Sequence, residues 1–167
     1  MKIEPVTIGI DNGLNGGLCA IRNTDSAVIG YTKMFTEQVG PKEEVDVKRL
    51  LDWVSNYGAG PLTICVEEPL KHAKNSQAMR SMSISFGQID GSLRAVGLTP
   101  KRIQVKDWQT EMLGKKVPTG QTKVFALRKA NTLWPEQKWL ATARSYVPHD
   151  GIVDAALIAR YYLEHKV

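Results

Sequence analysis

Five acidic residues in this chain have the types and the spacing needed to bind divalent cations: Asp11, Glu67, Glu68, Asp150 and Asp154. Asp150 and Asp154 are four positions apart, so a helix would carry both on one face. Clustered carboxylates repel one another and raise one another's pKa, and a bound cation relieves that repulsion. Mg²⁺ and Mn²⁺ prefer such hard oxygen ligands. Two of these ions about 4 Å apart activate a water molecule for attack on a phosphodiester.

Each acidic residue also has a structural explanation that involves no chemistry. Asp11 opens an Asp-Asn-Gly sequence, which is a common turn. Glu67 and Glu68 stand before a proline and fit a solvated strand end. Asp150 fits a helix N-cap, and Asp154 fits a first-turn acid favoured by the helix dipole. The chemical interpretation therefore depends on whether the fold brings these residues together.

Five short, largely apolar runs predict strands, and they cover residues 6–10, 17–21, 28–34, 62–66 and 101–105. The first three are joined by tight turns, which favours an antiparallel meander. The last two are each reached through a helical segment, which favours parallel pairing.

Apolar residues at helical spacing predict four helices, over residues 43–57, 79–96, 121–133 and 151–164. The second has a heptad-like stripe of apolar residues: Met79, Met82, Phe86, Ile89, Leu93 and Val96. The element order is βββαβαβαα. It predicts an α/β fold with a mixed five-stranded sheet, three antiparallel strands and then parallel strands, flanked by helices. This is the order of the RNase H-like fold.

That topology would bring the acidic residues to one place. The first and fourth strands are neighbours and parallel, so Asp11 and either Glu67 or Glu68 would lie side by side at their C-terminal ends. Functional sites in such sheets lie at those ends. If the last helix docks across the sheet, Asp150 and Asp154 complete a pocket of four carboxylates.

Length and composition predict one globular domain over residues 1–167. The net charge of +5 favours a polyanionic partner, although many basic proteins bind no nucleic acid. Cys19 and Cys65 stand alone in apolar runs, so we expect buried thiols in a reducing compartment. No apolar run approaches the ~18 residues of a membrane span, so we expect no membrane association, and the N-terminus does not resemble a signal peptide.

The motifs around the acidic residues resemble those of the RuvC-like Holliday junction resolvases over most of the chain. Residues 8–13, Ile-Gly-Ile-Asp-Asn-Gly, are similar to the family's first-strand motif, although the family usually has proline in place of Asn12. Residues 65–68, Cys-Val-Glu-Glu, are similar to its fourth-strand motif, and that match selects Glu67 over Glu68 as the ligand. Residues 73–75, Ala-Lys-Asn, resemble the segment that follows.

Residues 149–159 resemble the family's closing helix. Bacterial members tend to place its two acids three apart, whereas here they are four apart. Position 151 is glycine and cannot be a ligand, so Asp150 or His149 would take that role, as in phage-type and chloroplast relatives. We take Asp150 as the ligand. Three further candidate catalytic residues are His149, Glu68 and Lys123.

The resemblance implies an endonuclease that cuts four-way or branched DNA junctions in paired nicks, as a homodimer with two Mg²⁺ or Mn²⁺ ions per active site. The catalytic residues and metal ligands would be Asp11, Glu67, Asp150 and Asp154. The compact size and the phage-like motif variants suggest the cytoplasm of a bacterial or phage-infected cell, and an organelle also fits.

Basic residues gather in two regions that fit DNA binding. One lies between residues 101 and 129, where Gly114 and the Pro118-Thr119-Gly120 turn predict a flexible loop. The other follows Glu67 and enters the junction centre in the family, with Leu70 or a neighbour as a candidate wedge between bases. The candidate DNA-binding residues are Lys71, Lys74, Arg80, Lys106, Lys115, Lys116 and Lys123. A solvated helix-and-loop face is the alternative.

Three rival interpretations use the same residues. Another RNase H-like nuclease, acting on linear DNA or an RNA–DNA hybrid, would share the carboxylates. A fragment of the sugar-kinase and actin superfamily also opens with Ile-Asp-x-Gly, but residues 13–16 lack the hydroxyls of its phosphate loop. A non-catalytic junction-binding protein would not need all four acids. Trp108, Trp134 and Trp139 are expected to anchor the core rather than to stack on bases.

Overall fold

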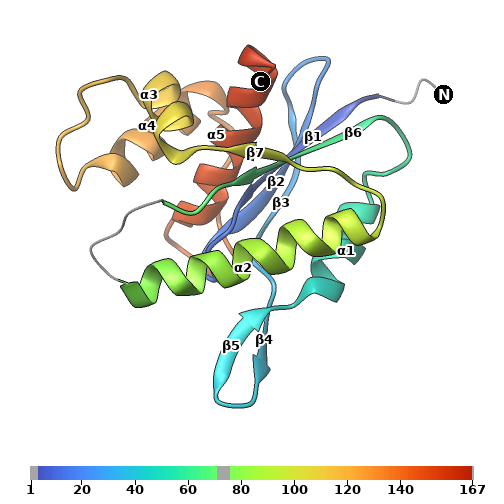
Figure 1. Cartoon of the computed structure of the whole chain (residues 1–167). Coiled ribbons are helices and arrows are strands. Elements are labelled where there is room, and N and C mark those ends of the chain that lie inside the picture. Colours follow the sequence, from blue (N-terminus) through green and yellow to red (C-terminus); the bar gives the residue numbers. More distant parts are fainter. Residues whose placement is uncertain (1–3, 71–75, 167) are drawn as a thin grey trace.

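The computed structural model describes residues 4–70 and 76–166, and a five-stranded mixed sheet forms its centre (Figure 1). The strand order is β3-β2-β1-β6-β7. β1, β2 and β3 pair antiparallel, whereas β6 and β7 extend the sheet from β1 in parallel. The bounds are β1 Val6–Asp11, β2 Gly17–Arg22, β3 Val28–Lys33, β6 Leu62–Glu67 and β7 Lys101–Ile103. The predicted RNase H-like sheet is confirmed.

Helices cover both faces of this sheet (Figure 1). One face carries α1 (Val47–Ser55) and α2 (Ser76–Ala95). The other carries α3 (Val105–Leu113), α4 (Thr122–Leu133) and α5 (Asp150–His165). α5 packs directly on β1, β2 and β6, and α3 and α4 cover its outer side.

Two buried clusters fill the spaces on either side of the sheet. Successive side chains of a strand point to opposite faces, so Ile8 and Ile10 of β1 reach the cluster that contains Leu50 of α1 and Leu93 of α2. The opposite cluster is formed largely by α5, which is buried along most of its length because it lies between the sheet and the other two helices. The last helix is therefore fixed from both sides.

A hairpin that the sequence pattern did not predict projects beside α2 (Figure 1). β4 (Thr36–Val39) and β5 (Lys42–Val45) form a separate two-stranded sheet. Gly40 closes the turn with φ of 58°, a conformation that glycine adopts without strain. Apolar periodicity gave no signal here, because no residue of β4 and only Val45 of β5 is buried, so the hairpin contributes little to the core.

The predicted start of the first helix was wrong. Glu43 and Glu44 lie in β5, and the helix begins only at Val47. Asp46 is its N-cap, and the Asp46 carboxylate accepts a 3.0 Å hydrogen bond from the backbone N–H of Arg49. Such a cap satisfies one of the free N–H groups of the first turn, so it fixes where the helix starts.

The predicted fifth strand was too long, and one helix was missed. β7 ends at Ile103, and α3 begins at Val105. Trp108 and Met112 are both buried and are four positions apart, which is the spacing of one helix face. The helical signal of this segment is short, and the pattern predicts a strand and a loop in its place.

The apolar stripe on α2 is only partly core. Ile89 and Leu93 are buried, whereas the three stripe residues nearer the N-terminus are half-buried. Val96 lies just beyond the helix and is 56% exposed. The N-terminal half of α2 therefore keeps apolar surface that the described chain does not fully cover.

The expectations for cysteine and tryptophan are confirmed. Cys19 and Cys65 are buried free thiols, and Trp108, Trp134 and Trp139 are buried core residues. Within residues 4–70 and 76–166, no helix combines the length and the apolar character that crossing a bilayer demands.

Candidate active site

The ends of β1 and β6 bring two of the predicted acidic residues together. The strands run parallel with Ile10 beside Val66, so Asp11 and Glu67 follow at the same edge of the sheet. The side chain of Asn12 is buried, and its Nδ2 donates a 2.5 Å hydrogen bond to the backbone carbonyl of Glu67. This bond ties the two strand ends to each other.

Glycine allows α5 to approach this edge closely. Gly16, in the turn after β1, forms an isolated β-bridge with Gly151, in the first turn of α5. A Cβ on Gly151 would overlap the backbone of Gly16, so a side chain at position 151 would force the two segments apart. The contact therefore holds Asp150 and Asp154 near the end of β1, where Asp11 lies.

Burial raises the pKa of three of these carboxyl groups, and repulsion between them adds to the effect. Burial, with a contribution from Asp150, raises the pKa of Asp11 to about 6. Burial, with Asp11 and Asp154, raises the pKa of Glu67 to about 8. Burial, with Asp11 and Asp150, raises the pKa of Asp154 to about 8. The four carboxyl groups, from three elements, thus act on one another electrostatically.

Two of the four carboxylates have a partner on α3 or α4. Nε1 of Trp108 in α3 donates a 2.6 Å hydrogen bond to Oε2 of Glu67. Nζ of Lys123 in α4 lies 2.6 Å from Oδ2 of Asp150. In the part of the chain that the structure describes, no three His, Cys, Asp or Glu side chains already converge as a metal site. Glu67 and Asp150 are engaged with Trp108 and Lys123 instead.

The chemistry of the donor set nevertheless suits a hard divalent cation. All four side chains offer carboxylate oxygens, the ligand type that Mg²⁺ and Mn²⁺ prefer. The raised pKa values of Asp11, Glu67 and Asp154 show that negative charge is costly here without a positive partner. A cation would lower that cost, and the residues that would hold it are Asp11, Glu67, Asp150 and Asp154.

A cleft of about 560 Å³ opens over the acidic edge. Its wall is formed by the turn after β1, the N-terminal half of α2 and the start of α5, and it includes Asp11, Asp150, Asp154 and Lys123. Glu67 is not part of this wall and is only 7% exposed. Three of the four carboxylates are therefore accessible from one cleft.

His149 and Glu68, two of the further candidates, occupy different places. His149 lines the cleft, its Nδ1 is buried without a hydrogen-bond partner among the described residues, and burial lowers its pKa. Glu68 lies in a separate small hollow beside Gln104. The structure thus brings Glu67, and not Glu68, into electrostatic contact with Asp11.

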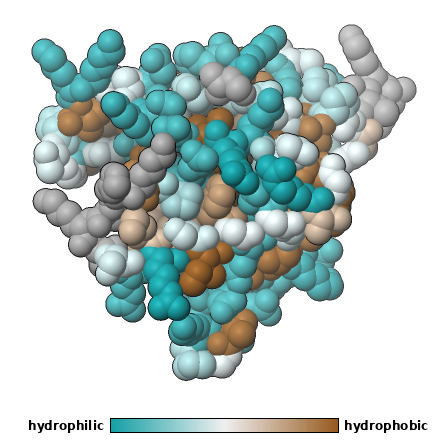
Figure 2. Space-filling view, viewed as in Figure 1, coloured by the Kyte–Doolittle hydropathy of each residue, from teal (hydrophilic) through white to brown (hydrophobic). Residues whose placement is uncertain are grey.

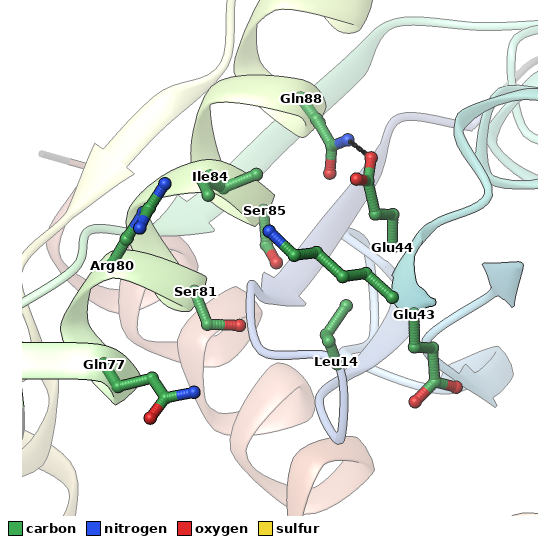
Figure 3. A pocket seen from close by; sticks show the side chains of 10 residues that line it. Leu14, Glu43, Glu44, Gln77, Arg80, Ser81, Ile84, Ser85 and Gln88 are labelled. Carbon is green, nitrogen blue, oxygen red and sulfur yellow. Dashed lines mark hydrogen bonds between the residues drawn. The ribbon is translucent and has the colours of Figure 1, made fainter. Parts of the chain in front are cut away.

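The predicted DNA-binding residues lie in three places. Lys123 lines the acidic cleft. Lys106 and Lys115 line a groove between α3 and the loop before α4, and Lys116 is exposed in that loop. Arg80 lies on α2, in a groove beside the β4–β5 hairpin (Figure 3). Two predicted residues, and the motif at 73–75, fall outside the described residues: Lys71 and Lys74.

Sequence reasoning missed the roles of Trp108 and Asn12. The sequence predicts Trp108 only as a core anchor, but its indole N–H also donates a hydrogen bond to Glu67. A buried indole usually finds a hydrogen-bond acceptor, and Trp108 follows β7, the neighbour of β6, so a partial signal was present. Asn12 was noted only as a departure from a sequence motif, and its bond to the Glu67 carbonyl depends on the strand register.

These features define an RNase H-like α/β protein with an acidic cleft at the C-terminal edge of its sheet. The chain is similar in structure to RuvC from T. thermophilus in complex with a Holliday junction substrate, with 15% identity, a TM-score of 0.63, and coverage of 96% of this chain and 95% of that chain. A second Thermus thermophilus RuvC structure has 16% identity, a TM-score of 0.61 and coverage of 96% of each chain. The fold is RuvC-like. No family model matches the sequence, and no curated protein matches it either.

Proposed function

We propose that this protein is a metal-dependent endonuclease that cleaves four-way DNA junctions by phosphodiester hydrolysis. The observation that carries the proposal is that Asp11, Glu67, Asp150 and Asp154 lie at the C-terminal ends of β1 and β6 and at the start of α5, close enough to act on one another electrostatically. The solved structure of T. thermophilus RuvC with a Holliday junction substrate, which has a similar fold, supports the choice of DNA.

The four carboxylates would hold two Mg²⁺ or Mn²⁺ ions. Bound ions of this kind activate a water molecule and neutralise charge on the leaving oxygen of the phosphodiester. The chain's own contribution is to orient the carboxylates. Trp108 holds Oε2 of Glu67 and leaves Oε1 available, while Asn12 fixes the backbone from which Glu67 projects.

Lys123 and His149 would act from the wall of the cleft. Lys123 now neutralises Asp150, and once Asp150 binds a cation the ammonium group is free to contact a DNA phosphate. His149 has its pKa lowered by burial, so its ring is neutral near pH 7 and can accept a hydrogen bond from water.

We further propose that the active form is a homodimer that forms through α2. Ile84 on this helix is 47% exposed, and Met79 and Met82 are only half-buried. A two-fold dimer sets two active sites at a fixed separation, which suits the near two-fold symmetry of a four-way junction. Paired nicks on opposing strands would follow from that geometry.

Cleavage of a labelled four-way junction by the purified protein tests the proposed function. We expect paired nicks with Mg²⁺ or Mn²⁺ and little cutting with Ca²⁺, whose looser coordination does not align the water. Linear duplex and an RNA–DNA hybrid are the matched substrates. Equal cutting of all three would overturn the junction preference and favour a general RNase H-like nuclease.

Asp11→Asn removes one ligand charge with little change of shape. We expect it to abolish cutting and to leave junction affinity near or above that of the wild type, since repulsion of the phosphate falls. A cleavage rate within about tenfold of the wild-type rate would show that Asp11 is not part of the active site. A wild-type protein that binds junctions but cuts none with any of these metals would be a binding protein instead.

A further inference from the structure

A second groove and the acidic cleft both include a residue of the first turn of α4. The second groove has a volume of about 330 Å³, within the range of small-ligand sites. Thr122 lines this groove, and its neighbour in the chain, Lys123, lines the acidic cleft. Leu70 also lines the groove and follows Glu67 by three residues, a chain distance of at most about 10 Å. The groove is thus near the carboxylates.

The distance between Glu67 and the groove is comparable to the distance between nearby nucleotides of one nucleic acid strand. Successive nucleotides of one strand are about 3.4 Å apart along a stacked helix and farther apart when unstacked. A strand with one phosphate in the acidic cleft would therefore carry a nucleotide about one to three positions away to the groove.

The walls of the groove have the chemistry that holds a nucleobase. Val105, Leu113 and Val117 supply apolar contacts for the faces of a base. The side chains of Gln109 and Thr110 also line the groove, and neither makes a hydrogen bond to another residue in the described part of the chain. Enzymes that take up an unstacked base contact its faces with aromatic or apolar side chains and hydrogen-bond its edge, for which an amide offers both a donor and an acceptor.

Charge distinguishes this groove from the groove beside the β4–β5 hairpin. Lys106 and Lys115 line it, and its wall contains no acidic residue. The groove of about 290 Å³ beside the hairpin is lined by Glu43 and Glu44 as well as by Lys42 and Arg80, with Glu44 turned toward Gln88 (Figure 3). In surface view, hydrophilic side chains gather over α3 and α4 with apolar patches between them (Figure 2). The α3 groove therefore has a net positive lining that favours a polyanion, whereas the charges that line the hairpin groove cancel.

We propose that the groove between α3 and the loop before α4 binds one unstacked nucleobase of the DNA strand whose phosphate lies in the acidic cleft. The inference rests on the proposed function and deepens it, because it makes the groove the place where the protein reads a base next to the cut. Gln109 contacts the edge of the base, and Lys106 and Lys115 contact the flanking phosphates.

Val117→Trp fills the groove, and Val124→Trp is the matched control. Val124 lies on α4, is 49% exposed, and belongs to the wall of neither the groove nor the cleft. Both substitutions are made in the Asp11→Asn protein so that the DNA stays intact. An abasic site is moved one nucleotide at a time through the centre of a four-way junction, and the dissociation constant is measured at each position.

In the Asp11→Asn parent, we expect an abasic site at one position to weaken binding about fivefold to hundredfold, the range for contacts to one base. Val117→Trp should weaken binding of the intact junction by a similar factor and remove most of the abasic effect. Val124→Trp should behave like the parent. A 2-aminopurine at the same position should brighten on binding to the parent and to Val124→Trp, and stay dim with Val117→Trp.

An abasic effect that is equal in the parent and in Val117→Trp would overturn the groove as a base site. If Val117→Trp does not fold, Gln109→Ala is used in its place. We expect Gln109→Ala to lose discrimination among the four bases at that position. Retained discrimination would overturn the proposal. Cleavage by the wild type separates the two proposals. A protein that cuts junctions without this base effect refutes the groove alone, and one that shows the base effect without cutting refutes the proposed nuclease alone.

Discussion

The indole N–H of Trp108 donates a 2.6 Å hydrogen bond to Oε2 of Glu67, and both side chains are buried. The bond joins α3 to the C-terminal end of β6. It holds one oxygen of the carboxylate in place, and it lowers the pKa of Glu67 against the burial that raises it. Trp108 is therefore a positioning residue for the candidate ligand as well as part of the core.

Trp108→Phe keeps an aromatic ring and deletes the N–H. We expect cleavage to fall about 10-fold to 100-fold, the usual cost of losing a partner that orients a metal ligand. Mn²⁺ binding, measured by electron paramagnetic resonance, should weaken. The pH profile of cleavage should move to higher pH, because the pKa of Glu67 rises when the bond is lost.

Trp139→Phe is the control for that substitution. Trp139 belongs to the same core cluster as Trp108, and its indole N–H donates a 3.0 Å hydrogen bond to Oδ1 of Asn131 rather than to a carboxylate. Each variant should lose about 1 kcal/mol of folding stability. Equal effects of both variants on Mn²⁺ affinity would show that Trp108 acts only through the core.

Substitution of Glu67 and Glu68 one at a time tests which of them belongs to the active site. Glu67→Gln should abolish cutting, because Glu67 interacts with Asp11 and Asp154. Glu68→Gln should keep cutting within about threefold, since Glu68 lies in a separate hollow. The measurement is the single-turnover cleavage rate at saturating Mg²⁺. The opposite ranking would move the ligand to Glu68.

Stability should fall as the pH rises in metal-free buffer. Burial raises the pKa of Asp154 from 3.8 to about 8, so the folded protein keeps a proton that the unfolded chain releases between those values. The stabilising contribution is complete below the lower value and is lost as the pH passes the higher one. Tm measured across this range should therefore decline, and Mn²⁺ should reduce the decline because it compensates the negative charge.

Asp154→Asn isolates this effect from Asp11 and Glu67, whose pKa values burial also raises, to about 6 and about 8. The variant should show a flatter pH dependence than the wild type, and its Tm should respond less to Mn²⁺. Identical slopes for the two proteins would mean that Asp154 does not carry a raised pKa in the folded state.

Gly151→Ala tests whether the close contact between α5 and the turn after β1 positions the acidic residues. The new methyl group would overlap the backbone of Gly16, so we expect a loss of about 1–3 kcal/mol in the free energy of unfolding and a loss of cleavage. Gly91→Ala in α2 is the control, because its Cβ would meet nothing within 4 Å. That variant should gain about 0.5–1 kcal/mol from helix propensity. Denaturant unfolding of both variants gives the comparison.

The sheet and the placement of the acids were predictable because they depend on local patterns and one topological rule. Apolar runs gave the strands of the sheet, and the parallel neighbours β1 and β6 necessarily end at the same edge. Asp11 and Glu67 therefore met as predicted. Helical spacing predicted that Asp150 and Asp154 share one face of the last helix. The close contact between Gly16 and Gly151, which holds that helix against the turn after β1, could not be predicted from the pattern.

What sequence reasoning missed depends on exposed segments or on tertiary contacts. The β4–β5 hairpin is mostly solvent-facing, so it lacks the apolar alternation that marks a buried strand. The contact between Trp108 and Glu67 spans 41 positions, and the bond from Asn12 spans 55. Both depend on the register of strands and helices, which no local pattern specifies.

Ile84→Arg tests the proposed homodimer. Ile84 is 47% exposed on α2, and a charge there would oppose burial against a second copy of the helix. Sedimentation at micromolar concentration should give a dimer for the wild type and a monomer for Ile84→Arg. Val124→Arg, on α4 with 49% exposure, is the control and should remain dimeric.

The same variant connects assembly to the cutting pattern. A monomer would still have one complete set of carboxylates, because all four come from a single chain. Ile84→Arg should therefore nick one strand of a junction at a time and lose the paired nicks, while Val124→Arg keeps them. Junctions should also bind with a steeper salt dependence than linear duplex in the wild type, because two copies contact more phosphates. A wild type that sediments as a monomer and still makes paired nicks would separate junction cleavage from dimerisation.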